Sequence, residues 1–483
     1  MSANKLPAID RRAFLTGSAS IVAASALPSD GADAAASVKE FRLVAAAGRV
    51  ALVGLPHPDT DVWCYGGRVP GPEIRVRQGE RVRITVENRL AEETTVHWHG
   101  VRVPNAMDGV PHLTQKPIAP KESFVYEFDC PDAGTFWYHP HQRSFEQMGR
   151  GLYGPLIVDE PQPIAVDRDV TWVLDDWRLL RDASISDDFG NMMDTGMAGR
   201  IGNTVTVNGR LPDTLVVRPG ERIRLRLVNA ANARIFALEF AGHRPQIIAL
   251  DGQPVEPHAP DGDRVVLGPA MRADLILDMT GASGARFRVT DTFYRGREYR
   301  LLDLVYGDTP LREGLPDTPI TLANNPLAES DLAAAQRHEV TFGGGMMSGM
   351  MAGGMRGGMM GGGMMGGMMQ GMRHDGVWTI NGASARGHVM DPMLILTRGR
   401  PYVLALHNNT AWDHPIHLHG HSFRVVSRDG RPTRFREWQD TLLMAPRERA
   451  EIAFVADNPG DWMFHCHILE HQAGGMMGVI RVS

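Results

Sequence analysis

One phrase recurs three times in this chain of 483 residues, and it restricts the fold more than any other feature of the sequence. Each copy has a glycine turn, an alternating run of polar and apolar residues, and an asparagine nine positions after the glycine; the copies span residues 77–88, 218–229 and 398–408. A glycine turn followed by such alternation is typical of a half-buried β-strand. Because helical periodicity is weak throughout, the sequence predicts three β-sandwich domains in series.

Histidine pairs follow the first and third copies but not the second. Nine residues after the asparagine, His-x-His stands at 97–99 and at 417–419, whereas the second copy has Leu-Glu-Phe at 238–240. Two further pairs stand at 139–141 and 465–467. Since residues i and i+2 of a strand share a face, each pair directs two imidazoles the same way, which suits a metal site. The sequence therefore predicts metal chemistry in the first and third domains and a middle domain that serves as a spacer.

Cys466 lies between two of these histidines, so its side chain is expected on the opposite face of the strand. His414, His471 and Met476 lie close to it in the sequence. A thiolate, two imidazoles and a weak axial thioether form the ligand set of a blue-copper electron-transfer site. Met477 is the alternative axial ligand, and zinc is less favoured because structural zinc sites more usually have paired cysteines.

These phrases resemble those of the multicopper oxidases, the laccase and copper-oxidase family, in both their order and their spacing. They are His97-Trp98-His99-Gly100, His139-Pro140-His141, His414-Pro415-Ile416-His417-Leu418-His419-Gly420, and His465-Cys466-His467 continuing to His471 and Met476. The resemblance covers about residues 40–483. It implies an all-β fold of three cupredoxin-like Greek-key β-sandwich domains in series, with four copper ions per chain: one type 1, one type 2 and two type 3.

The same resemblance implies a ligand set for each copper ion. The type 1 copper would bind His414, Cys466 and His471, with Met476 as the axial ligand. The type 2 copper would bind His97 and His417. The type 3 coppers would bind His99, His139 and His467 on one ion and His141, His419 and His465 on the other. Cys466 would then link the type 1 site to two type 3 ligands through a few covalent bonds, and the cluster should lie between domains one and three.

Asp108 and Gln472 bear on proton supply. Asp108 lies nine residues after His99, where relatives carry an acid near the cluster, and we expect it to relay protons. The alternative is an ordinary turn aspartate. Gln472 stands where several bacterial relatives carry glutamate, and an amide cannot relay protons as an acid. Asp108 and Cys466 are thus the predicted catalytic residues.

A glycine- and methionine-rich tract interrupts the third domain. Residues 343–372 contain 14 Gly and 12 Met, a composition that disfavours helix and strand interiors and predicts a mobile loop. Thioethers are soft ligands selective for Cu(I), so we interpret the tract as collecting cuprous ion for the blue site. The alternatives are a lid that limits bulky organic substrates and an inert linker. Relatives from bacterial copper tolerance carry a similar insert, but Thr410 and Trp412 stand where copper-oxidising relatives have Asp and Met.

The amino terminus has the features of an export signal. Arg11 and Arg12 precede an apolar run over 13–27, and small residues follow at 34–36, an order typical of twin-arginine signal peptides. The apolar run is too short to span a bilayer. We therefore expect export by the twin-arginine machinery, a periplasmic protein and no stable membrane insertion; a chance arginine pair in a disordered tail is the alternative.

The expected organisation is a signal peptide over 1–37, then cupredoxin domains over 38–162, 163–312 and 313–483, with the Gly/Met-rich insert at 343–373. A net charge of −6 argues against a nucleic-acid partner. Three cysteines cannot form a disulfide framework, although Cys64 and Cys130 could form one disulfide or remain buried thiols. We expect a monomer.

The predicted function is that of a copper-dependent oxidase. It would couple one-electron oxidation of substrate at the type 1 copper to four-electron reduction of O2 to water at a trinuclear cluster. The favoured substrate is Cu(I), in copper tolerance. The alternative is laccase-like oxidation of phenols and aromatic amines, and a periplasmic copper-binding protein without turnover is less favoured because the ligand set is complete.

Overall fold

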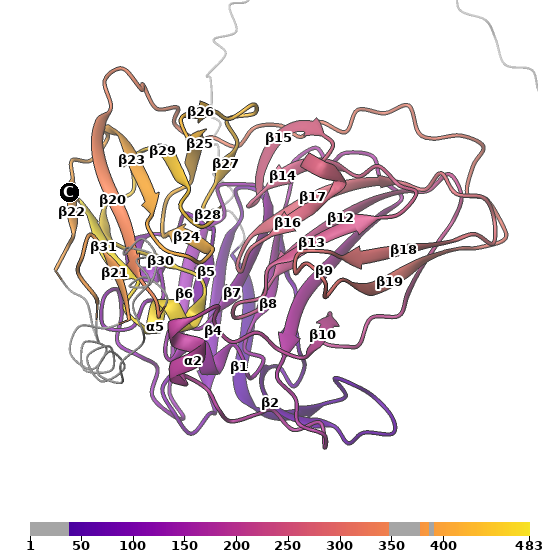
Figure 1. The fold of residues 1–483 in the computed structure, drawn as a ribbon, viewed down its shortest axis with the longest axis horizontal. Helices are drawn as coiled ribbons and strands as arrows, with labels where there is room; N and C mark the ends of the chain where they lie inside the picture. The colour runs from indigo at the N-terminus through magenta and orange to yellow at the C-terminus, as the bar shows by residue number, and fades with distance from the viewer. Residues whose placement is uncertain (1–37, 347–376, 386–390) are drawn as a thin grey trace, which may run out of the picture. The chain divides into compact units, whose positions relative to one another are not determined.

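The computed structural model describes residues 38–346, 377–385 and 391–483, so the predicted export signal lies outside the described residues. Its regular structure is almost entirely β, and it forms three successive pairs of sheets, called domains 1, 2 and 3 below (Figure 1). This confirms the predicted fold class. No helix in the described ranges is long and apolar enough to cross a membrane.

Domain 1 has two four-stranded sheets. The first has the order β2-β1-β4-β6, formed by β1 (Lys39–Val50), β2 (Thr60–Tyr65), β4 (Arg81–Asn88) and β6 (Ser123–Asp129). The second has the order β3-β8-β7-β5, formed by β3 (Ile74–Arg77), β5 (His97–His99), β7 (Gly134–His139) and β8 (Gly154–Asp159). The short helices η1 (Asn105–Met107) and α1 (Ser144–Gln147) lie in its loops.

Domain 2 has a six-stranded and a five-stranded sheet. The first, β10-β9-β12-β17-β14-β15, contains β9 (Arg168–Trp177), β10 (Thr204–Val207), β12 (Arg222–Asn229), β14 (Gln246–Leu250), β15 (Gln253–His258) and β17 (Arg272–Asp278). The second, β11-β19-β18-β13-β16, contains β11 (Thr214–Val217), β13 (Phe236–Phe240), β16 (Val265–Leu267), β18 (Arg286–Asp291) and β19 (Tyr299–Tyr306). The short helices α2 (Met192–Gly196) and η2 (Asp261–Asp263) complete it.

Domain 3 repeats the arrangement. One sheet, β21-β20-β23-β29-β25-β26, has β27 paired to β25 and contains β20 (Gln336–Gly344), β21 (Trp378–Ile380), β23 (Pro401–Asn408), β25 (Phe423–Arg428), β26 (Arg431–Pro432), β27 (Trp438–Gln439) and β29 (Arg449–Val455). The other, β22-β31-β30-β24-β28, contains β22 (Leu394–Leu396), β24 (His414–Leu418), β28 (Thr441–Met444), β30 (Gly460–Cys466) and β31 (Met477–Val482). Helix α5 (Leu469–Ala473) lies beside α2 of domain 2 (Figure 1).

The three sequence repeats are the strands β4, β12 and β23, which confirms their predicted conformation. Each lies between one parallel and one antiparallel neighbour: β1 and β6, β9 and β17, and β20 and β29. The preceding glycines Gly79, Gly220 and Gly399 all have φ near +80°, a conformation that L side chains rarely adopt. The repeat therefore marks the same central strand in each domain.

The repeated asparagine closes the loop that follows this strand. In domain 1, Asn88 Nδ2 donates to the carbonyls of Glu92 and Ile118, each at 2.8 Å, while its Oδ1 accepts from Leu90 N at 3.0 Å. The equivalent residues, Asn229 and Asn408, make the same kinds of contact in their own domains. Because these groups are buried, each needs an internal partner, and asparagine supplies both a donor and an acceptor.

The second repeat differs from the predicted half-buried pattern. Strand β4 alternates between buried and half-buried residues, but every residue of β12 is buried. The outward face of β12 carries Arg222, Arg224 and Arg226, which are paired with carboxylates; Arg226 also donates to Thr135 Oγ1 of β7 in domain 1 at 2.9 Å. The prediction is wrong here because the end of domain 1 covers Arg224 and Arg226, while Arg222 is buried against Asp278 and the segment at Thr318.

The structure also differs from the expectation for the start of the Gly/Met tract in domain 3. The Gly/Met tract was expected to be a loop from Gly343, but Gly343 and Gly344 are the last residues of β20 and pair with Thr379 and Trp378 of β21. A side chain at Gly344 would collide with the Val377 carbonyl, so only glycine continues the strand there. The tract from 347 onward lies outside the described residues.

Cys64 and Cys130 are free, buried thiols in separate hydrophobic clusters.

Candidate metal centre

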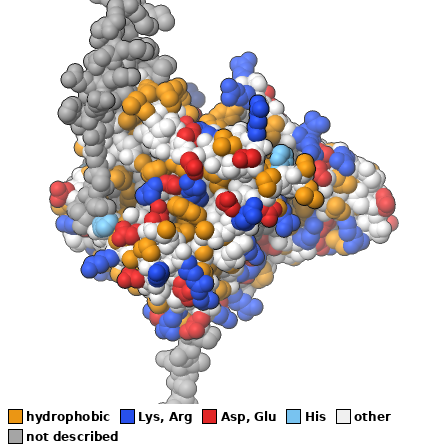
Figure 2. Space-filling view, turned by 90° about the horizontal axis from the view of Figure 1, so that it is seen from below, with side chains coloured by type: hydrophobic (Ala, Val, Ile, Leu, Met, Phe, Trp, Pro, Cys, Tyr) orange, Lys and Arg blue, Asp and Glu red, His pale blue; other side chains and the backbone are white. Residues whose placement is uncertain are grey.

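Eight of the predicted histidines converge where domains 1 and 3 meet. In domain 1, strands β5 and β7 place His97 opposite His139, and in domain 3, strands β24 and β30 place His417 opposite His465. The remaining four are His99 in β5 and His141, His419 and His467, which follow just after β7, β24 and β30. The two sets interleave, because the ring of His97 stacks on His419 and that of His99 on His417, with centroids 3.9 and 3.8 Å apart. All eight are buried, in keeping with the small area of histidine visible on the face in Figure 2.

His97 and His417 are held in the same way. The Nδ1–H of His97 donates to the Asp108 carbonyl and that of His417 to the Asp440 carbonyl, each at 2.8 Å. Their Nε2 atoms are buried and have no hydrogen-bond partner among the described residues. Buried polar atoms are nearly always paired, so two unpaired imidazole nitrogens indicate a ligand that the protein atoms do not include. These residues fit a metal ion bound between them.

The other six histidines form two groups of three. In the first, His139 Nε2 lies 3.4 Å from both His99 Nδ1 and His467 Nε2. In the second, His419 Nε2 lies 3.1 Å from His465 Nε2, and His141 completes a set whose ligand atoms all lie within 4.8 Å of one another. The residues of both groups are those that the motifs predict, although His97 also lies within 4.8 Å of the ligand atoms of His99 and His139. The imidazole nitrogens of each group face one another, as ligands of a common ion do.

A separate group lies next to α5, with Cys466 at its centre. Cys466 Sγ is 3.5 Å from His414 Nδ1 and 3.7 Å from His471 Nδ1, and the two Nδ1 atoms are 3.1 Å apart. Met476 is buried in the same hydrophobic cluster as Cys466, whereas Met477 lines a cavity beside His141. The structure thus brings together the predicted thiol and imidazoles, and it favours Met476 over Met477 as the nearby thioether.

The second nitrogen of each of these two imidazoles is also engaged. His471 Nε2 donates to the Met197 carbonyl at 2.7 Å, and His414 Nε2 lies 2.8 Å from Thr410 Oγ1. Both contacts leave Nδ1 free to face the thiol. Thr410, which the sequence marks only as a departure from copper-oxidising relatives, therefore orients His414.

Burial sets the protonation of these groups. It lowers the pKa of His139, His414 and His465 well below the usual value, and it lowers the pKa of His471 to about 3. These imidazoles are therefore neutral near pH 7, the form that binds metals. Burial also raises the pKa of the Cys466 thiol, so a bound cation is needed to stabilise the thiolate.

Asp108 contacts the cluster histidines directly. It follows η1, as a turn residue would, but its side chain is fully buried and its Oδ2 accepts from His419 Nδ1 at 2.9 Å. Its Oδ1 lies 3.2 Å from His97 Nδ1 but makes no hydrogen bond in the described part of the chain. The structure thus places a carboxylate oxygen with spare capacity beside the histidines, rather than an ordinary turn aspartate.

Asp440 is the counterpart of Asp108 in domain 3, and sequence reasoning missed it. Its carbonyl accepts from His417, and its Oδ1 accepts from His99 Nε2 at 3.1 Å and from Thr441 Oγ1 at 2.8 Å. Each aspartate therefore joins a histidine of its own domain to one of the other domain. Asp440 lies 23 residues after His417, against 11 between His97 and Asp108, so the repeat spacing carried no signal for it.

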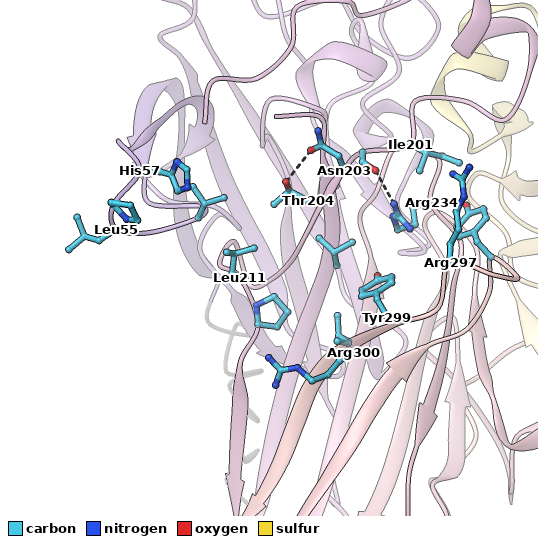
Figure 3. Close-up of a pocket in the computed structure, with 17 residues that line it drawn as sticks. Leu55, His57, Ile201, Asn203, Thr204, Leu211, Arg234, Arg297, Tyr299 and Arg300 are labelled. Atoms are coloured by element: carbon cyan, nitrogen blue, oxygen red, sulfur yellow. Dashed lines mark hydrogen bonds between the residues drawn. The ribbon is translucent and has the colours of Figure 1, made fainter. Parts of the chain in front are cut away.

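Two cavities lie near these groups. One, of about 310 Å³, reaches His141 and Gln472, and Gln472 Nε2 lies 3.5 Å from His141 Nδ1. The other, of about 890 Å³, lies between the loop after β1 and domain 2 and is lined by Arg234, Arg297, Arg300, Tyr294 and Tyr299 among others (Figure 3). The first gives the cluster a connection to the surface.

Comparisons with known proteins agree with this arrangement. Models of multicopper oxidase domains match residues 49–163, 168–300 and 364–483. The chain is 32% identical to multicopper oxidase MmcO of Mycobacterium tuberculosis, covering 88% of this chain and 84% of that protein. It is 26% identical to a copper resistance protein A homolog of Pseudomonas syringae pv. tomato, covering 95% of each, and 28% identical to Laccase-1 of Botryotinia fuckeliana, covering 85% and 77%. Among solved structures, a multi-copper oxidase from Pseudomonas thermotolerans is 35% identical, with a TM-score of 0.81, covering 93% of this chain and all of that one.

Proposed function

This chain belongs to the multicopper oxidase family of copper-dependent oxidoreductases, and from that premise we propose that it couples oxidation of Cu(I) to reduction of O2 to water. The observation that carries the proposal is the convergence of ten buried histidines and Cys466 into one three-donor group and one eight-histidine cluster. A copper-binding protein without turnover would not need the second cluster.

We assign the ligands as the motifs predict. His414, Cys466, His471 and Met476 would hold the type 1 ion, and His97 and His417 the type 2 ion. His99, His139 and His467, and His141, His419 and His465, would hold the two type 3 ions. Four copper ions, when bound, accept and pass electrons singly, so that O2 receives four without release of superoxide. The support for this assignment is the unpaired Nε2 atoms of His97 and His417 and the short distances between ligand atoms within each group.

Cys466 provides the connection between the two groups. It ends β30, and its neighbours His465 and His467 both belong to the eight-histidine cluster. His465 Nδ1 also donates to the Cys466 carbonyl at 2.9 Å, which offers a hydrogen-bonded route beside the covalent one. Electrons that reach the thiolate can therefore cross to either histidine through a few bonds.

Protons are supplied, in this proposal, by Asp108. Its Oδ1, which makes no hydrogen bond among the described residues, can hold a proton, while Oδ2 keeps the carboxyl beside His419. The 310 Å³ cavity at His141 offers an entrance for O2 and an exit for water. Gln472 lines that cavity but cannot act as an acid, so protons are transferred to the cluster through Asp108.

Exposed methionines close to the type 1 group favour Cu(I) as the substrate. Met192 and Met193 of α2 are 54% and 58% exposed. The same segment continues to Met197, whose carbonyl accepts from His471 Nε2. Thioethers bind Cu(I) selectively. Helix α2 therefore offers soft ligands a few residues before Met197, whose carbonyl is hydrogen-bonded to the proposed type 1 ligand His471. The start of the Gly/Met tract is joined to the same helix, because the N–H of Met346 donates to the Gly196 carbonyl of α2 at 2.9 Å.

The direct test of the function is a copper-loaded sample. It should be blue, and it should consume O2 when given a reductant. A colourless sample that holds copper would contradict the type 1 assignment, whereas a blue sample without O2 consumption would support the copper-binding alternative.

Removing the tract should separate the two substrate classes. We expect deletion of residues 347–372, which spares β20, to lower kcat/KM for Cu(I) by about tenfold, because a tethered ligand raises the local concentration of its ion. Oxidation of a phenol should be unchanged or faster. The measurement is kcat/KM for Cu(I) and for a neutral phenol with and without the tract.

A volume-conserving variant tests α2 in the same assay. Met192→Leu/Met193→Leu keeps the apolar surface and removes both thioethers. It should lower Cu(I) oxidation by a smaller factor than the deletion and leave phenol oxidation unchanged. Equal loss of both activities in either variant would contradict Cu(I) delivery.

A second candidate substrate class is favoured by the larger cavity. Ile201, which lines it, also packs on the hydrophobic cluster that contains Cys466 and Met476. Tyr294 and Tyr299 offer aromatic contacts, and Arg297 adds an exposed positive charge, whereas Arg234 and Arg300 are paired with carboxylates (Figure 3). Such a cavity suits aromatic substrates that carry a negative charge, in a laccase-like oxidation.

Reversing one charge tests this alternative. Arg297→Glu should lower kcat/KM for a carboxylated phenol about fivefold, as expected for an exposed charge pair worth ~1 kcal/mol. A neutral phenol should be oxidised as before. Arg295→Glu, also exposed but outside the cavity, is the matched control. Equal effects of the two substitutions would exclude the cavity as the binding site.

We also propose that residues 1–37 direct export through the twin-arginine machinery to the periplasm. A separate proposal is that the domain boundaries fall near residues 162 and 312. The support is the order of arginines, apolar run and small residues in the sequence, together with the extents of the three pairs of sheets.

A further inference from the structure

Domain 2 carries no candidate ligand, yet one of its arginines reaches the histidine cluster. Arg272, the first residue of β17, is fully buried. Its Nη1 and Nη2 donate to the two carboxylate oxygens of Asp440, at 2.8 and 2.5 Å. Its remaining donors are also used, by the carbonyls of Thr135, Asp251 and Ala270 at 2.9 to 3.2 Å. The guanidinium therefore has no freedom to turn away from Asp440.

A second residue of domain 2 supports the same aspartate from its backbone side. Asp251 Oδ2 accepts from the N–H groups of Asp440 and Thr441, at 3.2 and 3.0 Å, while its Oδ1 accepts from Arg272 N at 2.9 Å. Both the side chain and the main chain of Asp440 are thus fixed by domain 2. This matters because the Asp440 carbonyl and carboxylate hold His417 and His99, one from each of the two other domains.

The backbone next to His99 is shaped around this contact. Gly100 has φ of +84°, and a side chain there would collide with Arg272 Nη2 and Asp440 Oδ2. Close packing on this side contrasts with the Asp108 side, where one carboxylate oxygen makes no hydrogen bond among the described residues. Each aspartate binds one histidine through its carbonyl and another through its carboxylate. Only the carboxylate of Asp440 is in turn bound by Arg272 of domain 2.

We propose that Arg272 is a positioning residue that keeps the imidazoles of His99 and His417 in their metal-binding orientation by clamping Asp440 from domain 2. This rests on the proposed function, because it assigns a role toward the type 2 and type 3 ions. Asp440 is thereby held from domain 2 through its carboxylate and its main chain. Arginine suits this task because its planar fork meets both oxygens of a carboxylate at once, which the single ammonium of lysine cannot do.

The experiment compares copper retention rather than activity alone. Arg272→Met and Arg272→Lys are loaded with copper, dialysed against a mild chelator, and analysed for copper per chain and for the type 2 signal by electron paramagnetic resonance. We expect Arg272→Met to retain type 2 copper about tenfold less well than the parent, as for other residues that orient metal ligands, while the blue type 1 absorption is unchanged. Arg272→Lys should recover part of the loss.

Arg224→Met is the matched control for removing a buried arginine. Arg224 lies in β12 of the same sheet, is buried and is paired with Glu160 and Asp274, but contacts no histidine. Thermal melting of the copper-free proteins should show similar losses for both Met variants, with type 2 copper retained only by Arg224→Met. Should Arg272→Met fail to fold, Arg272→Lys against Arg224→Lys decides the same question.

Equal type 2 retention by the Arg272 and Arg224 variants would overturn the proposal, even if both were less stable. This failure differs from failure of the proposed function, in which the parent protein itself would lack the type 1 or type 2 signal.

Discussion

Replacing Cys466 by serine is expected to abolish the blue colour of the copper-loaded protein and to lower turnover by about 10³-fold or more, the scale reached when one member of a catalytic unit is removed. The reason is geometric. The thiol lies within 3.7 Å of the Nδ1 atoms of both His414 and His471, and it is covalently linked through the chain to His465 and His467. Absorption spectra and O2 consumption measure the two effects.

The other two cysteines are the natural controls for this substitution. Cys64 and Cys130 are also buried thiols, but they lie in hydrophobic clusters of domain 1. Cys64→Ser and Cys130→Ser should remain blue and active, whatever they cost in stability. A Cys466→Ser protein that stayed blue would show that the type 1 site has been misassigned.

Replacing Asp108 by asparagine is expected to slow the reoxidation of the reduced enzyme by O2 about 10²-fold or more, the lower range for loss of a general acid. Asparagine keeps the backbone carbonyl that holds His97 and can still accept from His419, but its amide cannot release a proton. Transfer of electrons from substrate to the type 1 site should be unaffected. Stopped-flow measurement of the two half-reactions separates these steps.

Asp175→Asn is the matched control for loss of a buried carboxyl. Asp175 is buried beside Tyr153, whose hydroxyl donates to its carboxylate at 2.5 Å, and it contacts none of the candidate ligands. The substitution should leave both half-reactions unchanged. If Asp108→Asn reoxidised at the rate of this control, protons would have to enter by another route, such as the cavity at Gln472.

The sequence predicted the central strands and the candidate ligands because both depend on local spacing. Alternation of period two describes β4 well, and it places both imidazoles of each His-x-His on one face. It failed at β12, where Arg222, Arg224 and Arg226 are buried with carboxylates from distant segments. It failed again at Gly343 and Gly344, because glycine propensity does not register the pairing partner that β21 provides.

The residues that orient the candidate ligands could not be predicted from the sequence. Arg272 and Asp440 are 168 positions apart, belong to no repeated phrase and lie in different domains. Thr410 was visible only as a departure from a known pattern, and its contact with His414 depends on how the loop after Asn408 folds. Nothing in local spacing distinguishes such contacts from those of ordinary surface residues.

What the sequence by itself determined is the kind of protein this is: three β-sandwich domains with paired histidines at equivalent strands of the first and third and one cysteine between two of them. Strand periodicity and motif order suffice for that. Only the tertiary structure decided which nitrogen of each imidazole remains available, because an imidazole is oriented by the partner of its other nitrogen. Those partners, the carbonyls of Asp108, Asp440 and Met197 and the hydroxyl of Thr410, are set by chain folding over long separations.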